Sequence, residues 1–279
     1  MGRLVIDELL KTTEAKNIIA AVRTPAKAQG LIDRGIQVRE ADYSRPETLA
    51  TAFKGAAKLL LISGTDLGKR EVQHKAAIDA AKSAGIKFVA YTSILHCDTS
   101  PLLLAVEHLA TERYLQSSGL NYSLLRNGWY YENQTAATPQ AIKNGALIGA
   151  SGDGRFAAAS RSDYAAAAAA VLTGEGHEDS VLELGGDQPY TRAELAAEVT
   201  ELVIDSLVRT RSSQTLPEEY ISDDDIAHEI LRIVTEENEH QIALIGKGPG
   251  DAEVEFVPVR SQVSENNMKR LFGSFKARG

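Results

Sequence analysis

Residues 71–91 read EVQHKAAIDAAKSAGIKFVAY, and this stretch gives the clearest indication of the architecture. Apolar residues at helical spacing predict a helix over Glu71 to Ala84. Gly85 follows directly, where the end of a helix favours a residue in the left-handed conformation. Lys87 to Tyr91 is short and almost continuously apolar, as in a strand that is covered on both faces. The stretch therefore predicts a helix that leads into a buried parallel strand.

The same order of helix, glycine and strand occurs four times, with Gly35, Gly55, Gly85 and Gly119 after the helices. The predicted helices cover Val5 to Lys11, Pro25 to Arg34, Arg45 to Lys54, Glu71 to Ala84 and Pro101 to Ser118. The predicted strands cover Asn17 to Val22, Ile36 to Arg39, Lys58 to Ile62, Lys87 to Tyr91, Asn121 to Leu125 and Val181 to Leu184. This alternation predicts an α/β fold with a doubly wound parallel sheet.

The amino-terminal end departs from this pattern. A Rossmann-like sheet normally begins with a strand and a glycine-rich turn, whereas this sequence begins inside the first predicted helix. In the usual strand order the first strand is central. We therefore expect a sheet that lacks its first strand, as in an amino-terminally truncated chain, unless another segment takes its place. Gln241 to Gly250 could supply that segment, but no predicted helix follows it. A hairpin explains these residues better.

Composition limits the class of protein. The net charge is −8 and 43% of the 279 residues are hydrophobic, as in an ordinary acidic globular protein, so nucleic acids and anionic membranes are not expected as partners. No apolar stretch approaches the length of a membrane span. The single cysteine, Cys97, fits a reducing compartment, and the cytoplasm is the expected location. The histidines have no metal-ligand spacing, so no metal is expected.

Four stretches carry a resemblance to a known family: AVRTPAKA at 21–28, READY at 39–43, YTSILH at 91–96 and LRNGWYYEN at 125–133. Over roughly residues 2–200 the chain resembles the NmrA-like NAD(P)H:quinone oxidoreductases, which are atypical short-chain dehydrogenases/reductases. The run Arg126 to Tyr130 is the most specific of these matches. The resemblance implies an NADPH-dependent reductase that transfers hydride to a quinone or a similar electrophile. Beyond about residue 205 the resemblance ends.

On this basis the chain is expected to have two parts and a less ordered end. The dinucleotide-binding Rossmann-like domain is predicted over residues 1–135. A smaller substrate-binding C-terminal lobe, interleaved with the sheet, is predicted over residues 136–279. Within the lobe we expect a helix with solvated loops over Ser212 to Glu239, hairpin strands over Gln241 to Ile245 and Glu253 to Val257, and a frayed tail over 265–279.

Several residues are predicted to bind the cofactor. Arg23 follows the second strand of a Rossmann unit, where an arginine meets the 2′-phosphate of NADPH, although a solvated surface arginine has the same sequence signature. Lys27 either assists it or is an exposed helix lysine. The resemblance implies that Gly2 is the last glycine of the phosphate-binding turn. It also implies that Asp42 and Tyr43 lie beside the adenine, whereas Asp42 alone could equally cap the following helix.

Further cofactor contacts are predicted at the ends of the next two strands. Ser63 and Gly64 end the predicted strand that begins at Lys58, at the topological switch point where small residues allow close approach of the cofactor. A tight turn alone would also explain Gly64. The resemblance places Tyr91, in the following strand, among the cofactor contacts.

The Tyr-x-x-x-Lys pair of classical short-chain dehydrogenases is absent from the predicted helix over Pro101 to Ser118. Leu104 and His108 stand at the corresponding positions. Quinone reduction needs no such acid, because hydride comes from the nicotinamide and protons can come from solvent. Ser93 either binds a substrate oxygen or caps a turn. His108 either holds the nicotinamide ribose or pairs with a neighbouring glutamate.

The aromatic segment after the sixth strand is predicted to cover the nicotinamide. Trp129 and Tyr130 would form a platform for a flat quinone, and Asn127 and Asn133 would bind its carbonyl groups. We predict Asn127, Trp129 and Tyr130 as substrate contacts and Asn133, with Ser93 and His108, as catalytic. The aromatic residues could instead be ordinary core residues.

Two other functions remain open from the sequence. NmrA-like proteins include regulators that sense the dinucleotide without turnover, and the missing first strand is also compatible with a remnant that binds no cofactor. The aromatic segment favours the enzyme, with a small quinone or electrophile as substrate, and a homodimer is possible.

Overall fold

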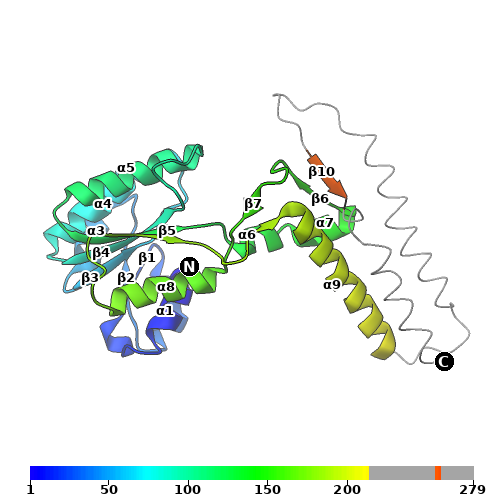
Figure 1. Ribbon diagram of the computed structural model, residues 1–279. Helices are drawn as coiled ribbons and strands as arrows, with labels where there is room; N and C mark the ends of the chain where they lie inside the picture. Colours follow the sequence, from blue (N-terminus) through cyan, green and yellow to red (C-terminus); the bar gives the residue numbers. More distant parts are fainter. Residues whose placement is uncertain (214–254, 259–279) are drawn as a thin grey trace, which may run out of the picture. The chain divides into compact units, whose positions relative to one another are not determined.

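A computed structural model describes residues 1–213 and 255–258 (Figure 1). The chain divides into two compact units. The first contains Met1–Tyr131 and Ala158–Asp187, and the second contains Glu132–Ala157 and Gln188–Gly279. The chain therefore leaves the first unit after Tyr131 and returns to it for Ala158–Asp187.

The first unit contains two parallel sheets. One has the strand order β3-β4-β5-β8 and the other pairs β1 with β2. Their bounds are Ile19–Val22 for β1, Gln37–Glu40 for β2, Lys58–Leu61 for β3, Phe88–Ile94 for β4, Asn121–Asn127 for β5 and Ser180–Leu184 for β8. All six strands were predicted from the sequence, and all neighbours pair parallel. The α/β class with a parallel sheet is confirmed.

Helices cover both faces of the four-stranded sheet (Figure 1). Leu49 of α3, Ile78 of α4 and Leu115 of α5 pack with β3, β4 and β5 in one buried cluster. Val5 of α1 and Ala165 of α8 pack in a second cluster with Ala90 and Leu125 of the sheet. The bounds are Gly2–Leu9 for α1, Gln29–Ile32 for α2, Pro46–Phe53 for α3, Arg70–Ser83 for α4, Leu103–Ser117 for α5 and Arg161–Thr173 for α8.

The four predicted cap glycines have the expected backbone conformation. Their φ angles lie between 78° and 80°, a region that residues with a Cβ atom rarely adopt: these glycines are Gly35, Gly55, Gly85 and Gly119. One predicted helix differs: Pro25 to Arg34 forms a 3-10 turn over Pro25–Ala28 followed by the short α2. Proline fixes the first of these turns and Gly30 weakens the second.

The described part of the second unit holds smaller elements. It contains α7 (Thr138–Asn144), β6 (Ala146–Gly149), β7 (Arg155–Phe156), β9 (Tyr190–Thr191), α9 (Arg192–Ser213) and β10 (Glu255–Pro258), and α6 (Tyr131–Thr135) leads into it. β10 corresponds to the predicted strand over Glu253 to Val257 and pairs antiparallel with β6. The predictions for 214–239, for 241–250 and for the tail lie outside the described residues. No helix in the described ranges is long and apolar enough to span a bilayer.

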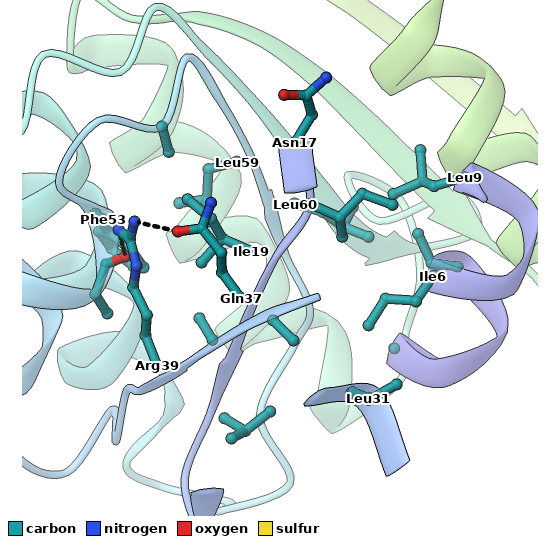
Figure 2. Close-up of a pocket in the computed structure, with 18 of the residues that line it drawn as sticks. Ile6, Leu9, Asn17, Ile19, Leu31, Gln37, Arg39, Phe53, Leu59 and Leu60 are labelled. Atoms are coloured by element: carbon teal, nitrogen blue, oxygen red, sulfur yellow. Dashed lines mark hydrogen bonds between the residues drawn. The ribbon is translucent and has the colours of Figure 1, made fainter. Parts of the chain in front are cut away.

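A cavity of about 970 Å³ lies between the two sheets of the first unit (Figure 2). We call it the inter-sheet cavity; it is bounded by β1, by β3 and by α1. Among residues 1–213 and 255–258, no strand lies between β1 and β3. The described sheet thus has the interruption that the sequence predicted, at the place of the central strand.

Candidate functional site

The residues predicted to bind the cofactor and substrate follow the carboxyl ends of the strands in the first unit. Because neighbouring strands are parallel, their carboxyl ends lie at one edge, where α/β proteins bind ligands. The structure brings these predicted residues to that edge: Arg23 after β1, Asp42 and Tyr43 after β2, Ser63 and Gly64 after β3, Ser93 near the end of β4, and Asn127 at the end of β5.

The first turn of α1 lies at the same edge. A Cβ atom built on Gly2 would stand 3.4 Å from Cδ1 of Ile62, just after β3. The guanidinium of Arg3 donates to the carbonyl oxygen of Lys27 at 3.2 Å, just after β1. Among the described residues, no side chain caps α1 at Met1, so the first N–H groups of this helix can bind an anion.

Arg3, Arg23 and Lys27 line the inter-sheet cavity beside this turn, near the carboxyl ends of β1 and β3. All three side chains are cationic. No aspartate or glutamate is among the described residues that line the cavity. Arg23 is exposed, and the described part of the chain gives it no ion-pair partner. A helix start without a cap and three nearby cations are the donor set that a phosphorylated dinucleotide requires, so the residues present fit such a cofactor.

Asp42 and Tyr43 form a tight corner after β2. The Asp42 carboxylate accepts from the backbone N–H of Ser44 at 2.9 Å and lies 3.6 Å from Nε of Arg45. The alternative in which Asp42 caps the next helix is wrong, because α3 begins with Arg45 as its N-cap and has no side-chain cap. The Tyr43 hydroxyl donates to the carbonyl oxygen of Ile62 at 3.2 Å, and burial raises its pKa to about 12.

The loop after β3 is held by two residues that the sequence reasoning did not select. The N–H of Gly64 donates to Nε2 of His74 at 3.0 Å, and Nε of Arg70 donates to the Gly64 carbonyl oxygen at 2.8 Å. Nδ1 of His74 lies 3.0 Å from Oγ1 of Thr111. His74 is fully buried, and burial lowers its pKa to about 4. A histidine on the alanine-rich face of the helix after this loop was the available sequence signal.

His108 has a different partner from those weighed in the sequence. Its Nδ1 lies 2.8 Å from the hydroxyl of Tyr91, and neither Glu107 nor Glu112 pairs with it in the described residues. Only 3% of His108 is exposed, and burial lowers its pKa to about 3. Burial also raises the pKa of Tyr91. Both groups are therefore neutral at pH 7.

A buried ionic network anchors the end of β4. Ser93 donates its hydroxyl proton to Glu112, which also receives two hydrogen bonds from Arg126, at 3.0 Å and 2.7 Å. Nη1 of Arg126 reaches Glu183 at 2.9 Å and Asp98 at 3.1 Å. These hydrogen bonds, first of all that with Glu112, raise the pKa of Arg126. Ser93 does not cap a turn, and its oxygen keeps only acceptor capacity for a ligand.

Asn127, Trp129 and Tyr130 lie at and after the end of β5. The side chain of Asn127 is buried, and its Oδ1 has no hydrogen-bond partner among the described residues. The ring of Tyr130 packs on the ring of Tyr164 with centroids 5.2 Å apart, and Arg161 lies over its face. Trp129 is 48% exposed, so it is not a core aromatic. The segment thus presents an exposed indole and a buried amide acceptor.

Asn133 lies on α6 in the second unit and is exposed. Its predicted catalytic role stays a prediction.

Burial of His108 makes the stability of the fold depend on pH. The folded-state pKa, about 3, is below the ordinary value of 6.5, so the unfolded chain binds the proton more tightly. This contribution is fully present above pH 6.5 and is lost as the pH falls toward 3. Between these two pH values the unfolding free energy of the wild type should fall with decreasing pH more steeply than that of His108→Gln. The difference between the two slopes should be up to about 1.4 kcal/mol per pH unit. Urea unfolding across this pH range measures the two slopes, and equal slopes would contradict the prediction.

The fold and this edge define a class of protein. The model of a family described as NAD(P)H-binding matches residues 1–175. The chain belongs to this family, and within it to the NmrA-like NAD(P)H:quinone oxidoreductases that the sequence resembles. The family prediction is therefore confirmed.

Particular relatives are similar to it at high identity. Quinone oxidoreductase 2 of Escherichia coli is 55% identical over 201 residues, which are 72% of this chain and 70% of that protein. The crystal structure of an NADPH-dependent quinone oxidoreductase from Escherichia coli complexed with NADPH is similar with a TM-score of 0.70 and 50% identity, covering 84% of this chain and 79% of that one. The triphenylmethane reductase of Citrobacter sp. complexed with NADP(H) has a TM-score of 0.69 and 34% identity, covering 86% and 82%.

Proposed function

We propose that this chain is an NADPH-dependent reductase that transfers hydride to a quinone or a similar electrophile. The observation that carries the proposal is the group of Arg3, Arg23 and Lys27 beside the start of α1, with no aspartate or glutamate among the described residues of the cavity wall. The close relative named as a quinone oxidoreductase and the similar structure with NADPH support the same cofactor and substrate class. We also propose that the protein is cytoplasmic. Its assembly into a homodimer stays a prediction.

In this proposal the cofactor lies along the carboxyl edge of the sheet. The N–H groups at Gly2 and the cations beside it would bind the diphosphate, and the exposed guanidinium of Arg23 would bind the 2′-phosphate. Asp42 and Tyr43 would border the adenine. The turn at Ser63 and Gly64, fixed by His74, would leave room for the cofactor backbone.

NADPH, when bound, supplies the hydride. The protein mainly positions the reactants and excludes water. The Ser93 oxygen and the Oδ1 of Asn127, which has no hydrogen-bond partner among the described residues, are acceptors, so they would bind N–H or O–H groups of the nicotinamide end. His108 is neutral and would orient Tyr91 and the ribose, without supplying a proton as an imidazolium. The proton for the reduced quinone would come from solvent, and the part of Asn133 in the reaction stays a prediction.

Trp129 is proposed as the platform for the quinone ring. Trp129→Ala should raise the KM for a simple benzoquinone by about tenfold, because an exposed indole offers a large stacking surface. Trp129→Phe keeps a flat ring and should change the KM by less than about threefold. NADPH affinity should be the same in both variants. Steady-state kinetics with varied quinone measures this effect, and equal KM values for all three proteins would remove Trp129 from the site.

Turnover tests the proposed function. The full chain is mixed with NADPH and benzoquinone, and the loss of reduced nicotinamide absorbance is followed. Quinone-dependent oxidation of NADPH, faster than the reaction without protein and saturable in quinone, is the expected result. NADPH binding without turnover would instead indicate a dinucleotide sensor. Absence of both would indicate a remnant that has lost the site.

A further inference from the structure

The turn over residues 62–64, directly after β3, is held by side chains from other parts of the fold. One of them comes from the corner after β2, one from β4 and two from the first turns of α4. Each bonds one backbone group of the turn, and three of the four are buried: Tyr43, Thr92, Arg70 and His74. A turn that is fixed in this way is preorganised, because a ligand that binds to it does not have to order it first.

The hydrogen bonds of His74 determine which of its ring nitrogens carries the proton. A backbone N–H can only donate, so Nε2, which accepts from Gly64 at 3.0 Å, is unprotonated. Burial lowers the pKa of His74 to about 4, so at pH 7 the ring is neutral and its proton lies on Nδ1. Nδ1 donates to Oγ1 of Thr111 at 3.0 Å, and the Thr111 hydroxyl donates to the carbonyl oxygen of Glu107 at 3.0 Å. The chain of donors therefore has one consistent direction, from Gly64 to the backbone of α5.

The bond to His74 also fixes the peptide that joins Ser63 to Gly64. In a trans peptide the N–H and the C=O point in opposite directions. Because the Gly64 N–H points toward His74, the carbonyl oxygen of Ser63 points away from α4. No group in residues 1–213 and 255–258 donates to this oxygen. Ser63 therefore presents a backbone acceptor on the side away from α4.

The hydroxyl of Ser63 adds a donor to this acceptor. Its oxygen accepts from the hydroxyl of Thr92 at 3.3 Å, and its own proton has no acceptor in the part of the chain that the structure describes. The residue is partly exposed and lies at the carboxyl edge of the sheet. An ionised phosphate can only accept hydrogen bonds, whereas a hydroxyl group both donates and accepts. The pair of groups on Ser63 is therefore complementary to a ribose hydroxyl.

We propose that His74 is a positioning residue for the dinucleotide, which fixes Ser63 so that its hydroxyl and its carbonyl oxygen bind a ribose hydroxyl. The inference rests on the proposed function, since it concerns how the same edge of the sheet holds NADPH. His74 does not touch the cofactor and acts through the peptide between Ser63 and Gly64. The ribose hydroxyl is one that NADPH and NADH share, so the contact serves both dinucleotides equally.

Dinucleotide affinity of the full chain tests the positioning role. His74→Phe keeps a flat ring but removes the acceptor for the Gly64 N–H. It should weaken NADPH and NADH by about tenfold each, since two neutral hydrogen bonds to the cofactor are lost. His74→Gln is the matched control, because its side chain can accept from Gly64 and donate to Thr111. It should keep both affinities within about threefold of the wild type, as titrations followed by nicotinamide fluorescence would measure.

A double-mutant cycle with Ser63→Ala separates positioning from a merely structural role. Ser63→Ala removes the donor and should weaken both dinucleotides by about fivefold. In His74→Phe the same contact is already lost, so the double variant should bind no more weakly than His74→Phe alone. Losses that multiply to about fiftyfold would show that the two residues act independently, and would overturn the proposal.

The outcomes distinguish this inference from the proposed function. A wild type that binds neither dinucleotide would overturn both. A wild type that binds both, together with a His74→Phe variant that unfolds cooperatively in urea and binds them equally well, would overturn the inference alone. If His74→Phe does not fold, Ser63→Ala decides: a fivefold loss for both dinucleotides supports the proposal, and unchanged affinities overturn it. A loss for NADPH alone would place Ser63 at the 2′-phosphate and overturn the ribose assignment.

Discussion

Replacement of Arg23 by alanine should weaken NADPH binding by about 10-fold to 100-fold and change NADH binding by less than about twofold. The guanidinium follows β1, is exposed and has no ion-pair partner in the described residues, so it is available for the 2′-phosphate. A charge-assisted hydrogen bond to such a group contributes about 1.5–3 kcal/mol. NADH lacks the 2′-phosphate and loses nothing specific. Titrations followed by nicotinamide fluorescence measure both affinities.

The matched control for Arg23 is Lys16→Ala. Lys16 is an exposed cation before the same strand, at its opposite end, and it pairs with Glu14. Its removal changes the net charge equally but should leave both affinities within about twofold, because a charge at that distance is largely screened. Equal losses for NADPH and NADH in Arg23→Ala would rule out the 2′-phosphate assignment.

Replacement of Glu112 by leucine should lower the free energy of unfolding by about 3 kcal/mol. The side chains of Glu112 and Arg126 are only 2% and 8% exposed, and two hydrogen bonds join them. Without Glu112 the buried guanidinium of Arg126 loses its buried partner and keeps only the more exposed carboxylates of Glu183 and Asp98. Urea unfolding at pH 7 measures the loss.

Glu183→Gln provides the comparison for this network. Glu183 also bonds Arg126, at 2.9 Å, but 35% of its side chain is exposed. Solvent screens this contact, so its loss should cost less than about 1 kcal/mol. If Glu183→Gln were as destabilising as Glu112→Leu, burial would not be the source of the effect.

The sequence predicted the order of the elements, but two of the predicted strands stop before the observed strands do. β4 continues past Tyr91 to Ile94, and β5 continues past Leu125 to Asn127. The added residues include Ser93 and Arg126, which look like loop residues by polarity alone. They are buried because Glu112, on a helix, satisfies both of them. A long-range partner of this kind cannot be read from local periodicity.

α8 was missed for a different reason. Its alanine-rich sequence has little amphipathic pattern, although Ser160 and Asp163 form a capping box that begins it. This spacing was visible in the sequence and is a known signature of a helix start. The loop-fixing roles of His74 and Arg70 required the structure, because only the fold brings them to Gly64.

Prediction of the candidate site was strongest where strand order alone places residues. Arg23, Asp42 and Ser63 lie at the carboxyl edge because parallel strands leave no other place for them. The hydrogen-bond directions within the site were beyond sequence reasoning. Ser93 gives its proton to Glu112, and His108 pairs with Tyr91, so both act as neutral positioning groups in the proposed reaction.

Binding of NADPH to the full chain tests the cofactor site at the carboxyl edge of the sheet. Titration calorimetry should show saturable one-to-one binding that is tighter for NADPH than for NADH. The reason is that Arg3, Arg23 and Lys27, beside the start of α1, can reach the phosphates of the cofactor. No heat of binding with either dinucleotide, from a chain that unfolds cooperatively, would contradict the assignment of this edge as the cofactor site.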